Sequence, residues 1–374
     1  MGAKDTQGAT GDSHSDDQAN LPSSGKPLDP LVDPDALVAY LDSALPETRG
    51  DPLGVERVRG GHSNETFFVT RGSHEWVLRR PPRGPLLPTA HDVAREHRVL
   101  SALADTPVPV PRPILLCADI GVIGAPFYLM QRVRGVVIRA SLPPAFEDDV
   151  ASRAALGYEL IDRLADLHMV DWQAAGLEGF GKPHGYLERQ LRRWTGQLDA
   201  SRNRPLPDLD AVTAWLGAHL PESVGASIVH GDYRLDNAMF APTPPAQVLA
   251  ILDWEMATIG DPLADLGYLL SFWQQADDPG MELGDAAWRI TALPGFVSRA
   301  QLVARYAERT GRRMEHVAFY VALAIWKLAI LLEGSYRRHL TGTTDDPFFA
   351  TLDLGVPSLA RRALAVCPGE MRVE

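Results

Sequence analysis

Residues 229–240, VHGDYRLDNAMF, are the most informative segment of this 374-residue chain. Asp232 stands five residues before Asn237, and a second acid, Asp253, follows in the segment ILDWE at 251–255. On a loop between two short strands, an acid and an amide at this spacing can direct both side chains into one cleft. An acid at the end of the following strand can then face them. The pattern therefore predicts that three oxygen-bearing side chains converge at one site.

This combination of side chains suits phosphoryl transfer, a reaction that needs little covalent chemistry from the protein. It needs a carboxylate near the acceptor hydroxyl, and oxygen ligands for a cation that binds the nucleotide phosphates. Mg²⁺ prefers oxygen ligands of this kind. The sequence therefore favours an enzyme that uses ATP and Mg²⁺.

The skeleton H-G-D-x-x-x-x-N followed by D-x-E resembles the aminoglycoside phosphotransferase superfamily, which shares its fold with protein, choline and homoserine kinases. The resemblance implies that Asp232 is the catalytic carboxylate. It also implies that Asn237 is a metal ligand and that Asp253 is the main metal ligand.

Neighbouring polar residues are interpreted as scaffold. We expect His230 to pack under the loop and orient it. In the superfamily, the segment GDPLADL at 260–266 braces the catalytic loop from the start of a helix. Asp261 precedes Pro262 and suits the helix N-cap, and we interpret Asp261 and Asp265 as structural.

The whole chain predicts an α+β, two-lobed protein-kinase-like fold. We expect a disordered tail at 1–32, a small β-rich, nucleotide-binding N-lobe with one key helix at 33–134, and a larger, mostly helical C-lobe for catalysis and acceptor binding at 135–374. Asp33 and Pro34 suit the start of the first helix. Other N-lobe elements are expected at 66–70, 76–78 and 126–130 as strands and at 91–104 as a helix. C-lobe helices are expected near 151–169, 186–199, 208–220, 262–276, 300–311 and 314–340, with a β-like block near 227–253.

Composition limits the partners. A net charge of −12 speaks against nonspecific binding to nucleic acid or to an anionic membrane. Cys117 and Cys367 match no metal spacing, so we expect reduced thiols in a cytoplasmic protein. The most apolar stretch, 319–332, contains Lys327 and is shorter than a membrane span, so we expect a buried helix. The expected partner is a small-molecule acceptor, and the oligomeric state is left open.

A glycine-containing segment, RGGHSNE at 59–65, lies between the first predicted strands. It resembles the G-G-x-S-N loop of the same superfamily but departs from the G-x-G-x-x-G pattern of protein kinases. Gly60 and Gly61 would let the backbone approach phosphate oxygens, and Ser63 and Asn64 are candidate phosphate donors. An ordinary turn is the alternative.

A kinase of this fold needs a cation on its third strand, and the segment WVLRR at 76–80 offers arginines instead of the usual Lys. Because side chains alternate along a strand, Arg79 would face the cleft with Val77, while Leu78 would point into the core. We expect Arg79 to bind phosphate and Glu96, on the next helix, to pair with it, unless this Glu is simply solvated. The adenine slot would be formed by residues that could equally be core: Val77, Met130, Gln131, Val133, Met239 and Leu252.

The acceptor site is predicted from the charge of residues 186–204. This segment holds five arginines against Glu188 and Asp199, a net charge of +3, whereas a polycationic aminoglycoside would need a pocket lined with acids. This surplus of positive charge favours an anionic acceptor, such as a carboxylic acid, a phosphate ester or a coenzyme A thioester. The alternative is that these arginines form an ordinary solvated helix face. The candidate acceptor-binding residues are Arg189, Arg192, Arg193, Tyr336 and Arg337.

Segments 76–92, 122–130 and 179–190 resemble one branch of the superfamily, the kinase-like domain fused to acyl-CoA dehydrogenases, and the resemblance covers roughly residues 35–345. It implies that the acceptor is a hydroxylated acyl group, free or as a CoA thioester. We therefore expect an ATP-dependent phosphotransferase that acts on a hydroxyl of a small, anionic metabolite. The alternatives are an aminoglycoside, choline-like or homoserine-like kinase and a catalytically silent nucleotide-binding module, for which Arg79 leaves room.

Overall fold

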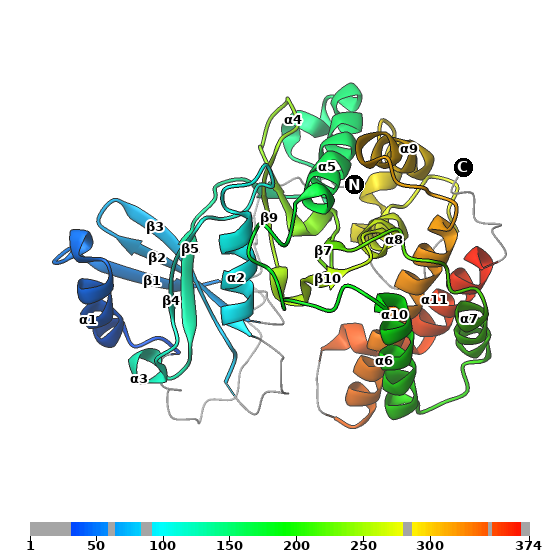
Figure 1. Ribbon diagram of the computed structural model, residues 1–374, viewed down its shortest axis with the longest axis horizontal. Helices are drawn as coiled ribbons and strands as arrows, with labels where there is room; N and C mark the ends of the chain where they lie inside the picture. The colour runs from blue at the N-terminus through cyan, green and yellow to red at the C-terminus, as the bar shows by residue number, and fades with distance from the viewer. Residues whose placement is uncertain (1–30, 59–63, 84–91, 280–285, 343–345, 368–374) are drawn as a thin grey trace, which may run out of the picture.

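The computed structural model describes residues 31–58, 64–83, 92–279, 286–342 and 346–367, which form two lobes (Figure 1). The smaller lobe is built on an antiparallel five-stranded sheet in the order β1-β2-β3-β5-β4. Its strands are β1 Leu53–Arg57, β2 Glu65–Arg71, β3 His74–Arg80, β4 Pro113–Cys117 and β5 Phe127–Gln131. The predicted tail, 1–32, lies outside the described residues except for its last two. The two-lobed α+β arrangement confirms the expected fold class.

The two faces of this sheet have different partners. Leu78 of β3 packs in a core with Leu37 of α1 (Pro34–Ala44), the helix at the outer side of the sheet (Figure 1). Val77 of the same strand belongs to the other core, which continues into the larger lobe. Helix α2 (Val93–Leu103) lies on this second face, between the sheet and the larger lobe. The sheet therefore presents one face of β3 to the junction of the lobes.

Helix α1 begins where the sequence predicts. The Asp33 carboxylate accepts hydrogen bonds from the backbone N–H groups of Asp35 (3.0 Å) and Ala36 (3.3 Å), and Pro34 occupies the first turn. These contacts satisfy donors that a helix leaves unpaired at its N-terminus. Val32, just before the cap, is already buried in the N-lobe core, so this lobe starts slightly earlier than expected.

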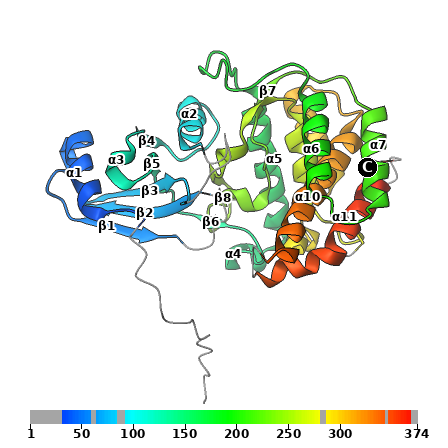
Figure 2. The same ribbon diagram turned by 90° about the horizontal axis from the view of Figure 1, so that it is seen from below.

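The larger lobe is mostly helical. Its helices of ten or more residues are α5 Arg153–Met169, α6 Tyr186–Ser201, α7 Pro207–Ala218, α8 Leu263–Phe272, α9 Arg299–Thr310, α10 Val317–Leu340 and α11 Leu352–Val366. Helix α10 lies between α6 and α11 (Figure 2) and also packs against α7 and α8. Each C-lobe helix that the sequence predicts is present close to its expected bounds, whereas α11 was not predicted.

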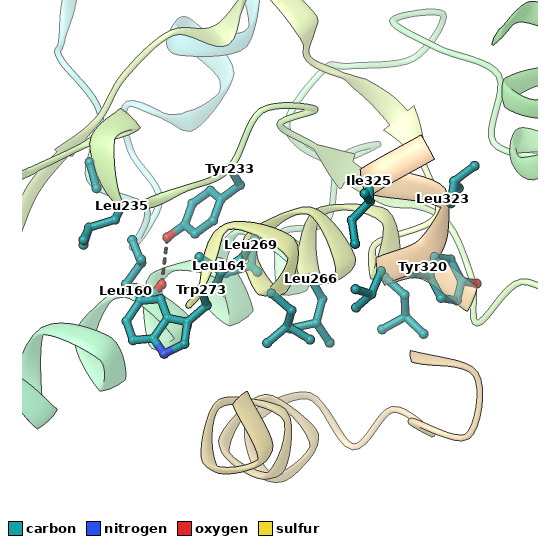
Figure 3. Packing of buried hydrophobic residues seen from close by; sticks show 14 of the residues in the cluster. Leu160, Leu164, Tyr233, Leu235, Leu266, Leu269, Trp273, Tyr320, Leu323 and Ile325 are labelled. Atoms are coloured by element: carbon teal, nitrogen blue, oxygen red, sulfur yellow. Dashed lines mark hydrogen bonds between the residues drawn. The ribbon is translucent and has the colours of Figure 1, made fainter. Parts of the chain in front are cut away.

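Helix α10 forms the centre of the larger lobe's core. Its side chains Tyr320, Leu323 and Ile325 join the same buried cluster as Leu266 and Leu269 of α8 (Figure 3). Within the described ranges, α10 is the one helix long and apolar enough to cross a membrane, but 78% of its most apolar window is buried in protein. This burial confirms the expectation of a core helix.

Short strands support the loop that carries the predicted catalytic residues. β7 (Ser227–Val229) pairs with β10 (Thr258–Gly260), while β6 (Val136–Val137), β8 (Ala238–Phe240) and β9 (Val248–Ile251) form a sheet in the order β6-β8-β9. Asp232 and Asn237 lie between β7 and β8, and Asp253 follows β9. The predicted β-like block therefore carries the three side chains on two chain segments, the β7–β8 loop and the end of β9.

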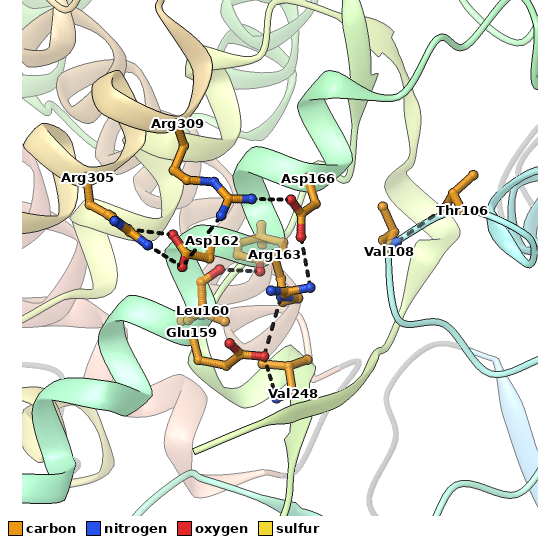
Figure 4. A network of polar contacts seen from close by, with 11 residues as sticks. Thr106, Val108, Glu159, Leu160, Asp162, Arg163, Asp166, Val248, Arg305 and Arg309 are labelled. Atoms are coloured by element: carbon orange, nitrogen blue, oxygen red, sulfur yellow. Dashed lines mark hydrogen bonds and ion pairs between the residues drawn. The ribbon is translucent and has the colours of Figure 1, made fainter. Parts of the chain in front are cut away.

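A polar network connects α9, α5 and β9 (Figure 4). Arg305 of α9 pairs with Asp162 of α5 at 2.8 Å. One turn away, Glu159 lies 3.4 Å from Arg163 and accepts a hydrogen bond from the backbone N–H of Val248 at 3.1 Å. Isolated exposed pairs contribute little to stability, but these groups share partners on three elements. The network therefore fixes the strand that leads to the site.

Candidate active site

The loop between β7 and β8 brings Asp232 and Asn237 together. The Nδ2 of Asn237 donates to Oδ2 of Asp232 at 2.7 Å and to the main-chain oxygen of Asp232 at 2.8 Å. These bonds fix the direction of the carboxylate and leave the Asn237 Oδ1 for another partner. The Asp232 side chain keeps 23% of its surface exposed, so a substrate can reach it.

His230 is fully buried and holds this loop in place. Its Nδ1 accepts from the backbone N–H of Asp232 at 3.2 Å, and its Nε2 lies 2.8 Å from the carbonyl oxygen of Leu252. Since Nδ1 accepts, the proton resides on Nε2, which donates to Leu252. The imidazole thus links the Asp232 loop to the strand end that carries Asp253.

Asp265, in the first turn of α8, braces the same loop. Its carboxylate accepts from the backbone N–H groups of His230 (2.6 Å) and Gly231 (2.8 Å) and lies 3.3 Å from Nε2 of His168. Burial acts to raise the pKa of Asp265, but the hydrogen bond and charge of His168 outweigh it and hold that pKa below its usual value. Gly231 has φ +88°, and a Cβ there would lie 2.8 Å from Met256, so this position requires glycine.

Asp253 follows β9 in a strained backbone conformation. Its φ is +63°, and among the described residues it is the only non-glycine with a positive φ. Such conformations cost roughly 1–3 kcal/mol each and cluster at functional sites. Both terminal nitrogens of Arg79 lie 3.4 Å from its Oδ1. The strained residue therefore faces a cation across the lobe junction.

Arg79 lies on the cleft face of β3, and its main partner is Glu96 of α2. Its Nη1 lies 2.9 Å from Oε2 of Glu96, the Tyr128 hydroxyl donates to the same carboxylate at 2.8 Å, and Nδ2 of Asn64 donates to the other oxygen. Burial raises the pKa of Glu96 to about 7, against the opposing effects of Arg79 and Tyr128. Arg80 lies on the opposite face, where main-chain carbonyls accept from it.

The predicted phosphate-binding loop is only partly described. Asn64 is buried, and its amide nitrogen bonds to Glu96 rather than standing free for a ligand. Its role toward phosphate stays a prediction. Gly60, Gly61 and Ser63 lie outside the described residues.

Several side chains predicted to form the adenine slot gather at the lobe junction. Val77 of β3 and Met130 of β5 stand opposite each other and belong to the core that continues into the larger lobe. Met239 packs against Gly135, where a Cβ would lie 2.6 Å from Cγ of Met239. The remaining candidates are partly or fully exposed: Gln131, Val133 and Leu252. This arrangement is suited to a slot, and base binding stays a prediction.

Asn237 and Asp253 are the candidate metal ligands. The described part of the chain holds no group of three or more His, Cys, Asp or Glu side chains arranged around one point. Mg²⁺, however, commonly takes only one or two carboxylates and completes its coordination with phosphate oxygens and water. The Asn237 Oδ1 and the Asp253 carboxylate fit that requirement, so this donor set suits Mg²⁺ that binds together with a nucleotide.

Arg234, inside the catalytic motif, is a site residue that sequence reasoning missed. Its Nε lies 3.4 Å from Oδ1 of Asp232 and 3.1 Å from Oδ1 of Asp236, and its guanidinium lies 4.9 Å from the ring centroid of Phe272. Burial acts to lower the pKa of Arg234, but the two carboxylates outweigh it and raise that pKa. A cation two residues after Asp232, the predicted catalytic acid, was the available signal.

A cavity of about 160 Å³ opens beside Arg234. Four apolar side chains, two arginines and one acid contribute to its walls. The lining residues are Ile138, Arg139, Arg234, Leu235, Asp236, Phe272, Ile290 and Thr291. Such walls suit a partly apolar anion better than a polycation.

The predicted acceptor residues differ in their availability. Arg192 and Arg193 are exposed on α6 and form no ion pair with any described residue. Arg189 instead donates to main-chain carbonyls of the preceding turn. Tyr336 donates to a carboxylate of α11 at 3.0 Å, and Arg337 donates to a carbonyl of α6. These last three side chains have structural partners.

The positive surplus of α6 and its C-terminal extension is partly neutralised. Arg202 pairs with Asp210 at 2.5 Å. Arg204 pairs with Glu333 at 3.0 Å and with Asp353 at 2.7 Å. These partners come from α7, α10 and α11, which sequence alone could not place beside α6. With Arg202 and Arg204 paired, the segment keeps Arg189, Arg192 and Arg193 against Glu188 and Asp199, a net charge of +1.

The sequence of this chain matches one family model and several curated proteins. The model of the phosphotransferase enzyme family matches residues 54–312. Acyl-CoA dehydrogenase family member 11 of Gallus gallus is 39% identical over 317 residues, which cover 83% of this chain and 40% of that protein. Family member 10 of Mus musculus is 36% identical over 310 residues, which cover 82% of this chain and 28% of that protein. The chain therefore spans less than half the length of these curated relatives.

Solved structures show the same fold. A Ralstonia eutropha protein provisionally named an aminoglycoside phosphotransferase aligns with a TM-score of 0.77 at 36% identity, covering 90% of this chain and 98% of that chain. Choline kinase of Cryptosporidium parvum aligns with a TM-score of 0.60 at 11% identity, covering 91% of this chain and 98% of that chain. At so low an identity, the second likeness shows the fold alone.

Proposed function

This chain belongs to the phosphotransferase enzyme family, and we propose that it transfers the γ-phosphoryl group of ATP to a hydroxyl of a small, anionic acceptor. The acceptor class we propose is a hydroxy acid or a hydroxyacyl-CoA thioester. One observation carries the proposal: Asp232, oriented by Asn237, is linked through His230 to the strand end that carries Asp253, and Asp253 faces Arg79.

In the proposed reaction, Asp232 orients the acceptor hydroxyl and takes up its proton. The hydroxyl oxygen bonds to the γ-phosphorus as the bond from that phosphorus to the β–γ bridging oxygen breaks, and ADP leaves. Mg²⁺, held by Asn237, Asp253 and the nucleotide phosphates, would supply positive charge to the phosphate oxygens. Arg79 would position the phosphates from the N-lobe side.

Two features support an anionic, partly apolar acceptor. The cavity beside Arg234 combines apolar walls with the cations of Arg139 and Arg234. Two relatives are named acyl-CoA dehydrogenases, and a region similar to this chain occupies part of each. We infer that such a region and the rest of those proteins act on related acyl compounds.

A Mg·ATP turnover screen tests the proposal. Acceptors would include 3- and 4-hydroxy acids, their CoA thioesters, choline, homoserine, sugars and aminoglycosides, with ADP release as the signal. We expect turnover with a hydroxyacyl compound, and we expect Asp232→Asn to lower it at least about 100-fold while ATP affinity stays within about twofold. Asp199→Asn, at an exposed position of α6, is the matched control.

The other outcomes decide between the alternatives. Wild-type turnover in Asp232→Asn would reject the role of Asp232. Turnover only with aminoglycosides or choline would keep the kinase and reject the anionic acceptor. ATP binding without turnover on the whole panel would favour a silent nucleotide-binding module.

A further inference from the structure

Helix α10 carries a single charged side chain within its apolar run. Between Val317 and Leu332, only Lys327 is charged, and it is partly buried. Removing an ammonium group from water without a partner is unfavourable. Its place in the centre of the larger lobe therefore calls for a physical reason.

The group that faces Lys327 is the ring of Trp194 on α6. The Nζ of Lys327 lies 5.5 Å from the ring centroid, and the guanidinium of Arg193 lies 5.7 Å from the centroid of a Trp194 ring. Within the described ranges, no hydrogen bond or ion pair involves Lys327. A cation–π contact is weak compared with the loss of hydration of an ammonium. Two cations therefore gather at one indole, and among the described residues no carboxylate forms an ion pair with either of them.

Asp232, the proposed catalytic carboxylate, acts electrostatically on Lys327. Burial lowers the pKa of Lys327 to about 8, Arg193 acts in the same direction, and Asp265 and Asp232 oppose them. Neither carboxylate compensates Lys327 directly. Asp265 is bonded to a histidine and to the loop backbone, while Asp232 is bonded to an amide and lies beside an arginine.

We infer that Lys327 and Arg193 form an anion site that binds the carboxylate or phosphate oxygens of the acceptor and places its hydroxyl at Asp232. The inference rests on the proposed function, because it assigns residues that determine acceptor specificity; neither Lys327 nor Arg193 lines the cavity beside Arg234. Arg79 is the cation that would contact the phosphates of ATP. ATP and the anionic acceptor would therefore each bind to their own cations.

The same pair of cations would discriminate between acceptors. A bound oxyanion would form charge-assisted contacts with both Lys327 and Arg193. Its negative charge would reduce the repulsion between these two cations. A polycationic acceptor would instead be repelled, which is a form of specificity by unfavourable contact. Recognition of the anion therefore predicts both affinity for hydroxy acids and exclusion of aminoglycosides.

Two acceptors of equal chain length isolate the anion: 4-hydroxybutyrate and the neutral 1,4-butanediol. Lys327→Met removes the charge and keeps an apolar stem, Lys327→Arg keeps the charge, and Lys182→Met removes a lysine that is exposed before α6. We expect Lys327→Met to lower kcat/KM for 4-hydroxybutyrate about 10- to 100-fold, mainly through KM. Turnover of 1,4-butanediol and the KM for ATP should not change, and the Tm should not fall, because an unpaired ammonium is no longer buried. Lys327→Arg should retain most activity, and Lys182→Met all of it.

The CoA thioester of 4-hydroxybutyrate distinguishes the source of the anion, because its carboxylate is consumed in the thioester. If Lys327→Met impairs only the free acid, the site binds carboxylate. If it also impairs the thioester, the site binds CoA phosphate. An equal loss for 1,4-butanediol and 4-hydroxybutyrate would overturn the inference.

Calorimetric binding of 4-hydroxybutyrate and of inorganic phosphate, without ATP, separates this inference from the proposed function. Binding by the wild type that Lys327→Met abolishes would support the anion site even if no acceptor were turned over. A wild-type protein that binds neither probe would overturn the anion site, even if the turnover screen found an acceptor.

Discussion

Arg79 stands where a kinase of this fold usually carries Lys, and it contacts the two acids Glu96 and Asp253. Arg79→Met should lower kcat/KM for ATP at least about 100-fold, because both acids lose their cation and the phosphates lose a partner. Arg79→Lys keeps the positive charge but loses the planar guanidinium group, so kcat/KM for ATP should stay within about tenfold of the wild-type value. Turnover and calorimetric ATP binding provide the measurements. Unchanged ATP affinity in Arg79→Met would show that the phosphates bind elsewhere.

Lys327 predicts a pH dependence of acceptor binding. Burial lowers its pKa from 10.5 to about 8, in a field set by Asp265, Arg193 and Asp232. The ammonium is charged below pH 8 and loses its proton above it, so anion binding is present below pH 8 and lost as the pH rises. The KM for 4-hydroxybutyrate should therefore increase between about pH 8 and 10, toward the value of Lys327→Met. A pH-independent KM in the wild type would contradict this.

At the scale of elements, the start of α8 holds the predicted catalytic loop through Asp265. Asp265→Asn keeps the shape but removes the charge that pairs with His168 and one of the acceptors used by the loop. We expect the free energy of unfolding to fall by about 3 kcal/mol and kcat to fall at least about tenfold. Denaturant unfolding and turnover measure the two effects. Asp199→Asn, at an exposed position, is the control. An equal loss of stability and kcat in Asp199→Asn would show that the effect of Asp265→Asn does not depend on its contacts with the loop.

Elements were predicted where an apolar pattern marks them. The helices from α5 to α10 follow apolar residues at helical spacing, so their existence depends little on distant contacts. Helix α11 was missed because Gly355 and Pro357 interrupt its pattern, and packing along α10 stabilises it instead. Strand β1 received no predicted bounds because it has only five residues and contains Gly54, so its alternation of partly buried and exposed residues includes only two apolar positions, Leu53 and Val55.

At the scale of the whole molecule, Arg95 ties the two lobes together. From α2, it donates to the carbonyl of Ala257 at 3.0 Å, and its guanidinium lies 3.7 Å from the ring centroid of Phe180. Arg95→Ala should let α2 move relative to the larger lobe and weaken the alignment of Arg79 with Asp253. We expect ATP affinity to fall about tenfold and the Tm to fall by several degrees.

Calorimetry and thermal unfolding test this contact. Arg112→Ala, which breaks an exposed pair with Asp105, serves as the control and should leave both quantities unchanged. If Arg95→Ala lowers the Tm but leaves ATP affinity intact, the contact stabilises the fold without aligning the nucleotide side.

The sequence by itself determined the identity and order of the candidate reactive groups. Asp232, Asn237 and Asp253 lie within one short stretch of chain, so local strand ends and loops suffice to bring them together. The choice of Arg79 over Arg80 followed from strand alternation for the same reason. The direction of a side chain on a short strand or loop depends mainly on residues that are adjacent in the sequence, so a single sequence contains the information needed to predict it.

Only the tertiary structure decided which charges remain uncompensated. Arg202 and Arg204 are paired by acids of distant helices, whereas Lys327, which looked like part of an apolar helix, has no such partner among the described residues. Partners of this kind are separated by up to about 150 positions along the chain. Electrostatic compensation depends on distance in space, and a single sequence does not specify which distant side chains meet.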